Sequence, residues 1–159
     1  MFERLKELFA ARGASPNELT ESHATAFAAA MLLLEVAWAD HEIATSEMEA
    51  ARRGISRLFG LTSEETNAII ARAHREHAAS TSIFPFTREL NAALPPVAKR
   101  QLVSMLWRLA YTDAVLTGYE EHAIRRIADL LHLSHGDFIA AKLTGRDDGN
   151  VSAKPPRES

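Results

Sequence analysis

Apolar residues recur along nearly the whole chain at the spacing of three and four residues that is typical of amphipathic helices. In the most apolar region, one helical face carries Phe27, Met31, Leu34 and Trp38. No stretch shows the sustained alternation of apolar and polar residues that indicates a half-buried strand. At 159 residues, the chain is long enough to bury one hydrophobic core. We therefore predict an all-α fold, a single-domain bundle of about seven to eight helices.

Turn and capping residues divide this pattern into separate helices. The Ser/Thr-x-x-Glu spacing of a capping box occurs at Ser46–Glu49, Thr62–Glu65 and Thr117–Glu120, and each pair predicts the start of a helix. Gly60 predicts the end of one helix, and Pro96 suits the first turn of another. Together these signals predict a helix from about 18 or 22 to 39 and helices over about 46–59, 62 to 77 or 79, 96–112 and 117–131. They also predict two short helices, one ending at residue 94 and a last one over about 134–143.

The composition changes at both ends of the chain. We predict a short N-terminal helix within residues 1–14, stopped by Gly13, and a main helical domain over residues 15–144. Residues 145–159 contain one branched aliphatic residue, Val151, among glycine, proline and charged residues. Such a segment cannot bury enough apolar surface to offset its ordering entropy, so we predict a disordered tail.

The overall composition argues against several functional classes. The formal net charge is -3 and the basic residues are scattered, so we expect no nucleic-acid binding. The chain has no cysteine, which excludes disulfides, thiol nucleophiles and zinc sites built on thiolates. Charged residues interrupt the N-terminal apolar stretch, and Glu35 interrupts the most apolar run, so we expect neither export nor membrane insertion. The expected location is the cytoplasm.

One short phrase occurs twice in the sequence. The stretches AWADHEIATSEME and AYTDAVLTGYEE share an aspartate, an aliphatic residue three positions later and a glutamate seven positions later. When they are aligned, Asp40 falls on Asp113 and Glu47 falls on Glu120. In each copy a long predicted helix ends near the aspartate, and a second helix with an acidic first turn follows. We interpret the copies as pseudo-symmetric helix-loop-helix repeats whose apolar faces pack together in one bundle.

The segments AWADHEIATSE and AYTDAVLTGYE resemble the TerB-like family of tellurite-resistance proteins, whose signature Asp-x-x-Ile/Leu-x-x-x-Glu occurs twice in an all-helical domain. The resemblance covers roughly residues 24–143. It implies a link to tellurite and chemical-stress responses, binding of a divalent metal through acidic residues, and occurrence as a domain joined to other modules. It implies no catalytic activity. This chain departs from the family where His41 and Ala114 replace the glycine that usually follows the aspartate.

The two aspartates of the repeated phrase are the residues that most need an explanation. Asp40 and Asp113 are each predicted at the C-terminal end of a helix, where the helix dipole disfavours a carboxylate by about 0.3–1 kcal/mol. One interpretation is local, with the side chain accepting hydrogen bonds from backbone N–H groups of the following loop. The other is a cation, calcium or magnesium, held by the carboxylates of Asp40, Glu47, Asp113 and Glu120. Helix capping would explain both glutamates without a ligand.

The other candidate sites are weaker. His74 and His77 flank Glu76 on a predicted helix, but the His-Glu-x-x-His order of zinc proteases is absent, so we interpret both as surface histidines. Trp38 and Trp107 are predicted to anchor the core. The sequence contains no nucleophile with an activating neighbour and no Gly-rich phosphate loop, so we expect no enzyme activity.

Two functions are consistent with these features. The first is a TerB-like, cytoplasmic stress-response and interaction module that binds a divalent cation through the four acidic residues. The second is a metal-free helical adaptor that recruits a protein partner, either soluble or associated with a membrane. Both interpretations predict a protein partner.

Overall fold

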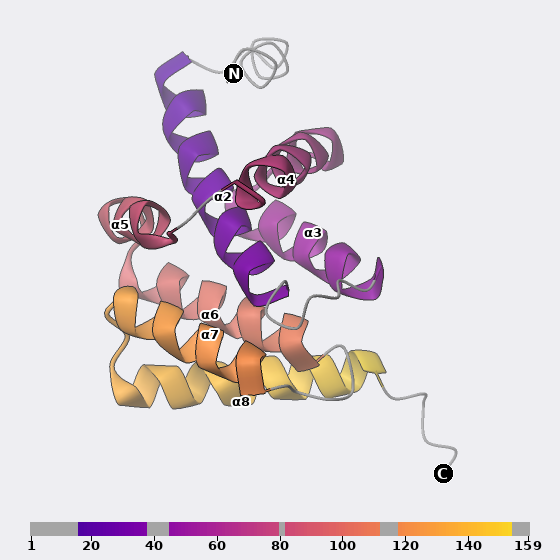
Figure 1. The fold of residues 1–159 in the computed structure, drawn as a ribbon, viewed down its shortest axis with the longest axis vertical. Helices are drawn as coiled ribbons and strands as arrows, with labels where there is room; N and C mark the ends of the chain where they lie inside the picture. Colours follow the sequence, from indigo (N-terminus) through magenta and orange to yellow (C-terminus); the bar gives the residue numbers. More distant parts are fainter. Residues whose placement is uncertain (1–15, 38–44, 80–81, 112–117, 154–159) are drawn as a thin grey trace.

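The computed structural model describes residues 16–37, 45–79, 82–111 and 118–153, with side chains at 23–37, 48–79, 82–111 and 118–146. Within those ranges the chain forms helices and no strand (Figure 1). The helices are α2 (Pro16–Ala37), α3 (Thr45–Phe59), α4 (Ser63–His77), α5 (Phe84–Ala93), α6 (Pro96–Tyr111), α7 (Gly118–Leu130) and α8 (His135–Ala153). The predicted all-α fold is confirmed, while the helix predicted within residues 1–14 lies outside the described residues.

Helices α4, α6 and α8 begin where the sequence predicts, whereas α2 begins earlier, at Pro16, and α3 begins at Thr45, one residue before the predicted cap Ser46. Thr62 forms the predicted capping box of α4: its side chain accepts a hydrogen bond from the backbone N–H of Glu65 at 3.2 Å. In return, the Glu65 carboxylate accepts one from the backbone N–H of Thr62 at 3.0 Å. Helix α6 begins at Pro96, and the Ser134 hydroxyl accepts from the backbone N–H of Asp137 at the start of α8. These starts need local hydrogen bonds alone, which is why the sequence predicts them.

Two helices end in a left-handed residue. Gly60 has φ +63° after α3, as its position in the sequence predicts. His132 has φ +63° after α7, an uncommon conformation for a residue with a side chain. The backbone N–H of Leu133 donates to the Ala128 carbonyl, and that of His132 donates to the Asp129 carbonyl. This Schellman arrangement satisfies carbonyls at the end of α7 and turns the chain toward α8.

Helix α2 forms the centre of the fold. Every residue in the range 26–34 is buried, so this helix is apolar on all sides rather than along one stripe. It packs against α3 and α4 on one side, against α5 on the other, and against α6 and α7 at its C-terminal half (Figure 1). Alanines in this range allow the neighbouring helices to approach closely. The position of α2 therefore organises the whole core.

Helices α6, α7 and α8 lie side by side across the lower part of the view in Figure 1. The most extensive helix pairing in the described chain is that of α6 with α8. The buried residues of α6 are Leu102, Val103, Leu106, Trp107, Leu109 and Ala110. Trp107 is completely buried, which confirms its predicted role as a core anchor, whereas Trp38 lies outside the described residues.

The predicted end of the last helix is wrong. Helix α8 was expected to stop near Leu143, with a disordered tail from Gly145, yet it continues to Ala153. Gly145 is buried against α6, where a Cβ atom would lie 2.5 Å from the Ser104 carbonyl oxygen. The absence of a side chain thus allows close helix packing here, whereas composition alone suggested disorder. Residues 154–159 lie outside the described residues.

The order of elements agrees with the proposed helix-loop-helix repeats. Helices α2 and α3 flank the first acidic phrase, and α6 and α7 flank the second. The pseudo-symmetry of the two pairs in space stays a prediction. Among the described helices, none is both long and apolar enough to cross a membrane.

Candidate functional site

The structure describes one of the four predicted metal ligands in full. Asp40 and Asp113 lie outside the described residues. Glu47 is the third residue of α3, but its side chain is not among those described. Glu120 is the third residue of α7, and it is 1% exposed. The joint geometry of the four carboxylates therefore stays a prediction.

The helices that carry the two acidic phrases form one contacting group. Helix α2 ends three residues before Asp40, and it packs against α3, α6 and α7. Helix α6 ends two residues before Asp113, and it packs against α3 and α7 as well as α2. Segments that are distant in the sequence are thus supported by a shared core, which is the arrangement that a site built from both phrases would require.

Adjacent glutamates at the start of α7 have different surroundings. Glu120 is buried, whereas the Glu121 side chain is 37% exposed. The Glu121 carboxylate lies 3.7 Å from the Arg125 guanidinium and 3.7 Å from the Lys142 ammonium of α8. Both glutamates are in the first turn, where the helix dipole favours negative charge. Glu121 therefore acts as a surface ion-pair partner, and Glu120 is the acidic group withdrawn from water.

An aromatic cluster supports the end of α6 just before the second phrase. The rings of Trp107 and Tyr111 stack with centroids 5.9 Å apart, and Phe138 of α8 meets Trp107 edge-on at 5.8 Å. Burial raises the pKa of Tyr111, an effect that Arg146 opposes and Glu121 reinforces. These contacts hold the C-terminal turn of α6 firmly against α8.

A polar cluster between α2 and α4 was not predicted. His23 is 2% exposed, and burial lowers its pKa to about 4, with Glu65 opposing that shift. Arg72 of α4 lies over the Phe27 ring at 5.3 Å and forms a 3.0 Å ion pair with Glu76. One signal could have revealed this cluster, because His23 precedes Phe27 by four residues and so continues the apolar face of α2.

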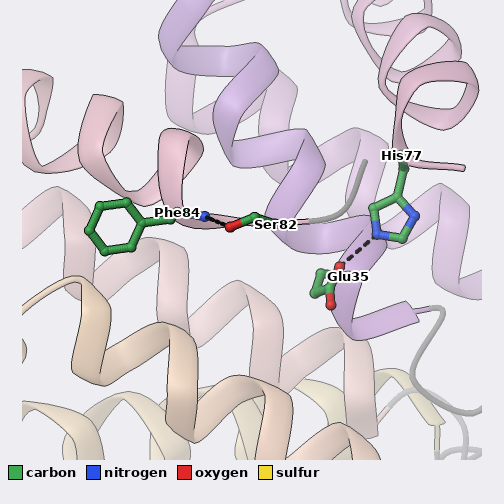
Figure 2. Close-up of polar contacts among 4 residues, drawn as sticks. All are labelled: Glu35, His77, Ser82 and Phe84. Atoms are coloured by element: carbon green, nitrogen blue, oxygen red, sulfur yellow. Dashed lines mark hydrogen bonds and ion pairs between the residues drawn. The ribbon is translucent and has the colours of Figure 1, made fainter. Parts of the chain in front are cut away.

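The interpretation of His77 as a plain surface histidine is wrong. Its Nε2 atom lies 2.8 Å from a carboxylate oxygen of Glu35, across the contact between α4 and α2 (Figure 2). His74, by contrast, is exposed as predicted. Glu35, which interrupts the apolar run of the sequence, therefore joins α2 to α4 through His77.

The start of α5 is also visible in Figure 2. The backbone N–H of Phe84, the first residue of α5, donates a hydrogen bond to the Ser82 hydroxyl at 3.1 Å.

Comparison with known families identifies the class of this domain. The family model described as tellurite resistance protein TerB matches residues 26–143, well over half of the chain. The chain belongs to the TerB family. The matched TerB region contains both acidic phrases and most of the helices described above. No curated protein and no solved structure was found to match the chain.

The described part of this TerB domain contains no group of three His, Asp or Glu side chains placed to hold a metal ion. That finding does not test the four predicted ligands, because the side chains of Asp40, Glu47 and Asp113 are not among those that the structure describes. The chemistry of these four ligands suits a hard cation, since all four donors are carboxylates. The TerB acidic phrases therefore remain the leading candidate for a cation site.

Proposed function

We propose that this TerB-family domain is a non-catalytic binding module of a chemical-stress response, and that it binds a divalent cation. The ligands would be Asp40, Glu47, Asp113 and Glu120, and the cation would be calcium or magnesium. The observation that carries the proposal is the packing of α2, α3, α6 and α7 against one another, with Glu120 buried where α7 begins.

Helix geometry adds a physical reason to expect a cation between the phrases. The last carbonyl groups of an α-helix accept no hydrogen bond from within the helix, and they give its C-terminal end a partial negative charge. This applies to the ends of α2 and α6. Asp40 and Asp113 follow these ends and add full negative charges. A divalent cation would offset both contributions. Calcium takes six to eight oxygen ligands at about 2.3–2.6 Å, so backbone carbonyls and water would complete the shell.

Calorimetric titration of the full chain with calcium and magnesium tests this proposal. We expect saturable binding to the wild type and none to an Asp40→Asn/Asp113→Asn variant. Asp129→Asn, which removes the same charge from an exposed position on α7, is the matched control and should bind normally. Absence of saturable heat in the wild type, or an unchanged isotherm in the double variant, would remove the metal site.

A second comparison uses the adjacent glutamates of α7. Glu120→Gln removes a buried carboxylate, while Glu121→Gln removes one that is partly exposed and paired with Arg125 and Lys142. We expect the first substitution to weaken cation binding and the second to have little effect. Equal losses would indicate that only the overall charge near α7 matters.

The alternative function is a metal-free adaptor for a protein partner, soluble or membrane-associated. The observation that favours it is a set of large apolar side chains on the described surface: Phe84, Val97, Tyr119, Ile139 and Leu143. Ile139 and Leu143 are one turn apart on α8, so they share a face. Partner binding that survives both a chelator and the Asp40→Asn/Asp113→Asn variant, but is lost in Ile139→Ser/Leu143→Ser, would support the adaptor.

A further inference from the structure

We propose that a groove between α3, α6 and α8 binds a small organic anion with an apolar body. The groove has a volume of about 340 Å³ and opens to solvent. The described residues that line it are Gly54, Arg57, Leu58, Gln101, Ser104, Met105, Arg108 and Thr144. None of them belongs to the acidic phrases, so the groove and the proposed cation site share no residue.

The charges in the groove favour an anion. Arg57 comes from α3 and Arg108 from α6, so arginines of two separate helices line the same groove. The described lining contains no aspartate or glutamate. A guanidinium presents a planar fork of donors that matches carboxylate, sulfonate and phosphate oxygens. The side chains of Gln101, Ser104 and Thr144 add neutral hydrogen-bonding groups around the same space.

The apolar lining of the groove indicates the rest of the ligand. Leu58 and Met105 are partly buried and pack at the margin of the core. A Cβ atom at Gly54 would lie 2.5 Å from the terminal methyl carbon of Met105, so glycine lets that side chain lie directly against α3. Methionine is flexible and polarizable, which allows it to adapt to different apolar groups. A ligand with an apolar body would cover Leu58 and Met105 while its anionic group meets the arginines.

The size of the groove favours a small molecule over a protein segment. Ligand pockets commonly have volumes of about 300–1,000 Å³, and this groove lies near the lower end of that range. A bare inorganic oxyanion would use the arginines but leave the apolar surface exposed to water. The chemistry therefore fits a carboxylate or sulfonate attached to an aromatic ring or a short alkyl chain.

A neighbouring hollow on α3 provides a contrast within the same protein. It shares Arg57 with the groove, and its other described lining residues are Glu49, Arg52, Arg53, Ser56 and Ser63. In that hollow the Arg52 guanidinium forms a 2.6 Å ion pair with Glu49. The residues that the structure describes around this hollow include no leucine or methionine. A basic surface on α3 is therefore not sufficient for the proposed site, and Arg53 offers a matched control for Arg57.

Fluorescence titration with anilinonaphthalene sulfonate, an aromatic anion, tests the proposal on the full chain. We expect saturable binding at one site in the wild type and at least about tenfold weaker binding in Arg57→Gln/Arg108→Gln. Arg53→Gln removes the same charge from the same helix and should stay within about twofold of the wild type. Failure of the wild type to bind, or an equal loss in Arg53→Gln, would overturn the site.

Competition tests the two parts of the ligand separately. Octanoate should displace the dye, because it combines a carboxylate with an apolar chain, whereas acetate and sulfate at equal concentration should not. Amide NMR shifts on octanoate addition should centre on Gly54, Ser104 and Thr144. Displacement by sulfate alone, or shifts centred on the exposed Phe84 and Val97, would contradict the proposal.

Two checks separate this site from folding effects and from the cation site. Arg57 is exposed, so the single Arg57→Gln variant is expected to fold normally and to bind at least about threefold more weakly even if the double variant unfolds. The Asp40→Asn/Asp113→Asn variant should bind octanoate like the wild type. A loss of octanoate binding in that variant would show that the groove is not independent of the acidic phrases, and would overturn the assignment.

Discussion

The interface of α2 with α4 and the interface of α6 with α8 are built from opposite kinds of residue. Between α2 and α4, His23 is buried near Glu65, and a carboxylate oxygen of Glu35 lies 2.8 Å from Nε2 of His77. Between α6 and α8, Gly145 lies against the α6 backbone beside the completely buried Trp107. Both interfaces join helices that are not consecutive in the sequence, and both contribute residues to the same hydrophobic core.

Because the two interfaces differ in composition, we expect different changes to destabilise them. The α2–α4 interface contains His23, whose burial lowers its pKa and favours the neutral imidazole, so protonation of His23 should weaken this interface without any change in shape. The α6–α8 interface leaves no room for additional atoms, so a small increase in volume should weaken it at any pH. The first interface is therefore sensitive to conditions and the second to substitution.

The largest expected effect is at Gly145. In Gly145→Ala the new methyl group would lie 2.5 Å from the Ser104 carbonyl oxygen and 2.6 Å from the Cβ atom of Trp107, both of which are fixed by α6. We expect a loss of about 3 kcal/mol in the free energy of unfolding, measured by urea denaturation, at the upper end of the usual cost of overpacking.

Gly136 provides the control on the same helix. A Cβ atom there would have no neighbouring atom within 4 Å, so Gly136→Ala should leave stability unchanged or raise it by up to about 1 kcal/mol through helix propensity. If Gly145→Ala were as stable as Gly136→Ala, the close approach of α8 to α6 would not exist in solution.

The next effect concerns pH at His23. Its folded pKa of about 4 lies below the unfolded value of 6.5, so the unfolded chain binds more protons between these values. The contribution of His23 to the free energy of unfolding is therefore fully present above about pH 6.5, and it is lost as the pH falls toward 4. We expect this group to remove about 2 kcal/mol of unfolding free energy by pH 5.

Urea denaturation at pH 7.5 and pH 5 measures that loss. His23→Leu should show a smaller difference between the two conditions than the wild type, whatever its stability at pH 7.5. Ala30→Gly, a substitution without a titrating group on the same helix, should lower stability equally at both values. An undiminished pH difference in His23→Leu would assign the effect to other groups.

The smallest effect is expected for the Glu35–His77 pair. Because the Glu35 side chain is 36% exposed, solvent screens the interaction, and we expect a coupling energy of about 0.5 kcal/mol. A double-mutant cycle with Glu35→Gln and His77→Gln at pH 6 measures it, with Gly136→Ala as an uncoupled reference. A coupling energy above about 2 kcal/mol would show that the pair behaves as a buried one. The α2–α4 interface would then depend on polar contacts even more than its comparison with the close-packed α6–α8 interface suggests.

Much of the helical framework could be predicted because it depends on neighbouring residues. The capping box of Thr62 with Glu65, the stop at Gly60 and the start at Pro96 involve contacts within a few positions. The left-handed turn at His132 could not be predicted in the same way, since it also depends on how α7 must lead into α8. A helix end can therefore be predicted from the sequence when the residue there favours the required backbone conformation, as Gly60 does and His132 does not.

The interactions between helices were harder to predict. The composition of residues 145–159 predicted disorder, yet Gly145 is the residue that lets α8 approach α6. His77 looked like a surface residue because its partner, Glu35, is 42 positions away in the sequence. The groove of Arg57 and Arg108 has no sequence signature, because it exists only where α3, α6 and α8 come together. Composition and spacing contain no information about such distances.

The sequence by itself determined the all-helical class, the repeated acidic phrase and membership of the TerB family, because each follows from residue types at short spacing. It also named Asp40, Glu47, Asp113 and Glu120 as candidate ligands, a prediction that cation titration must test. Only the tertiary structure decided that α2 is buried on all sides, that α8 extends to Ala153, and where the polar and close-packed interfaces lie. The physical reason is that burial and contact depend on which helices meet, and no residue specifies its distant neighbours alone.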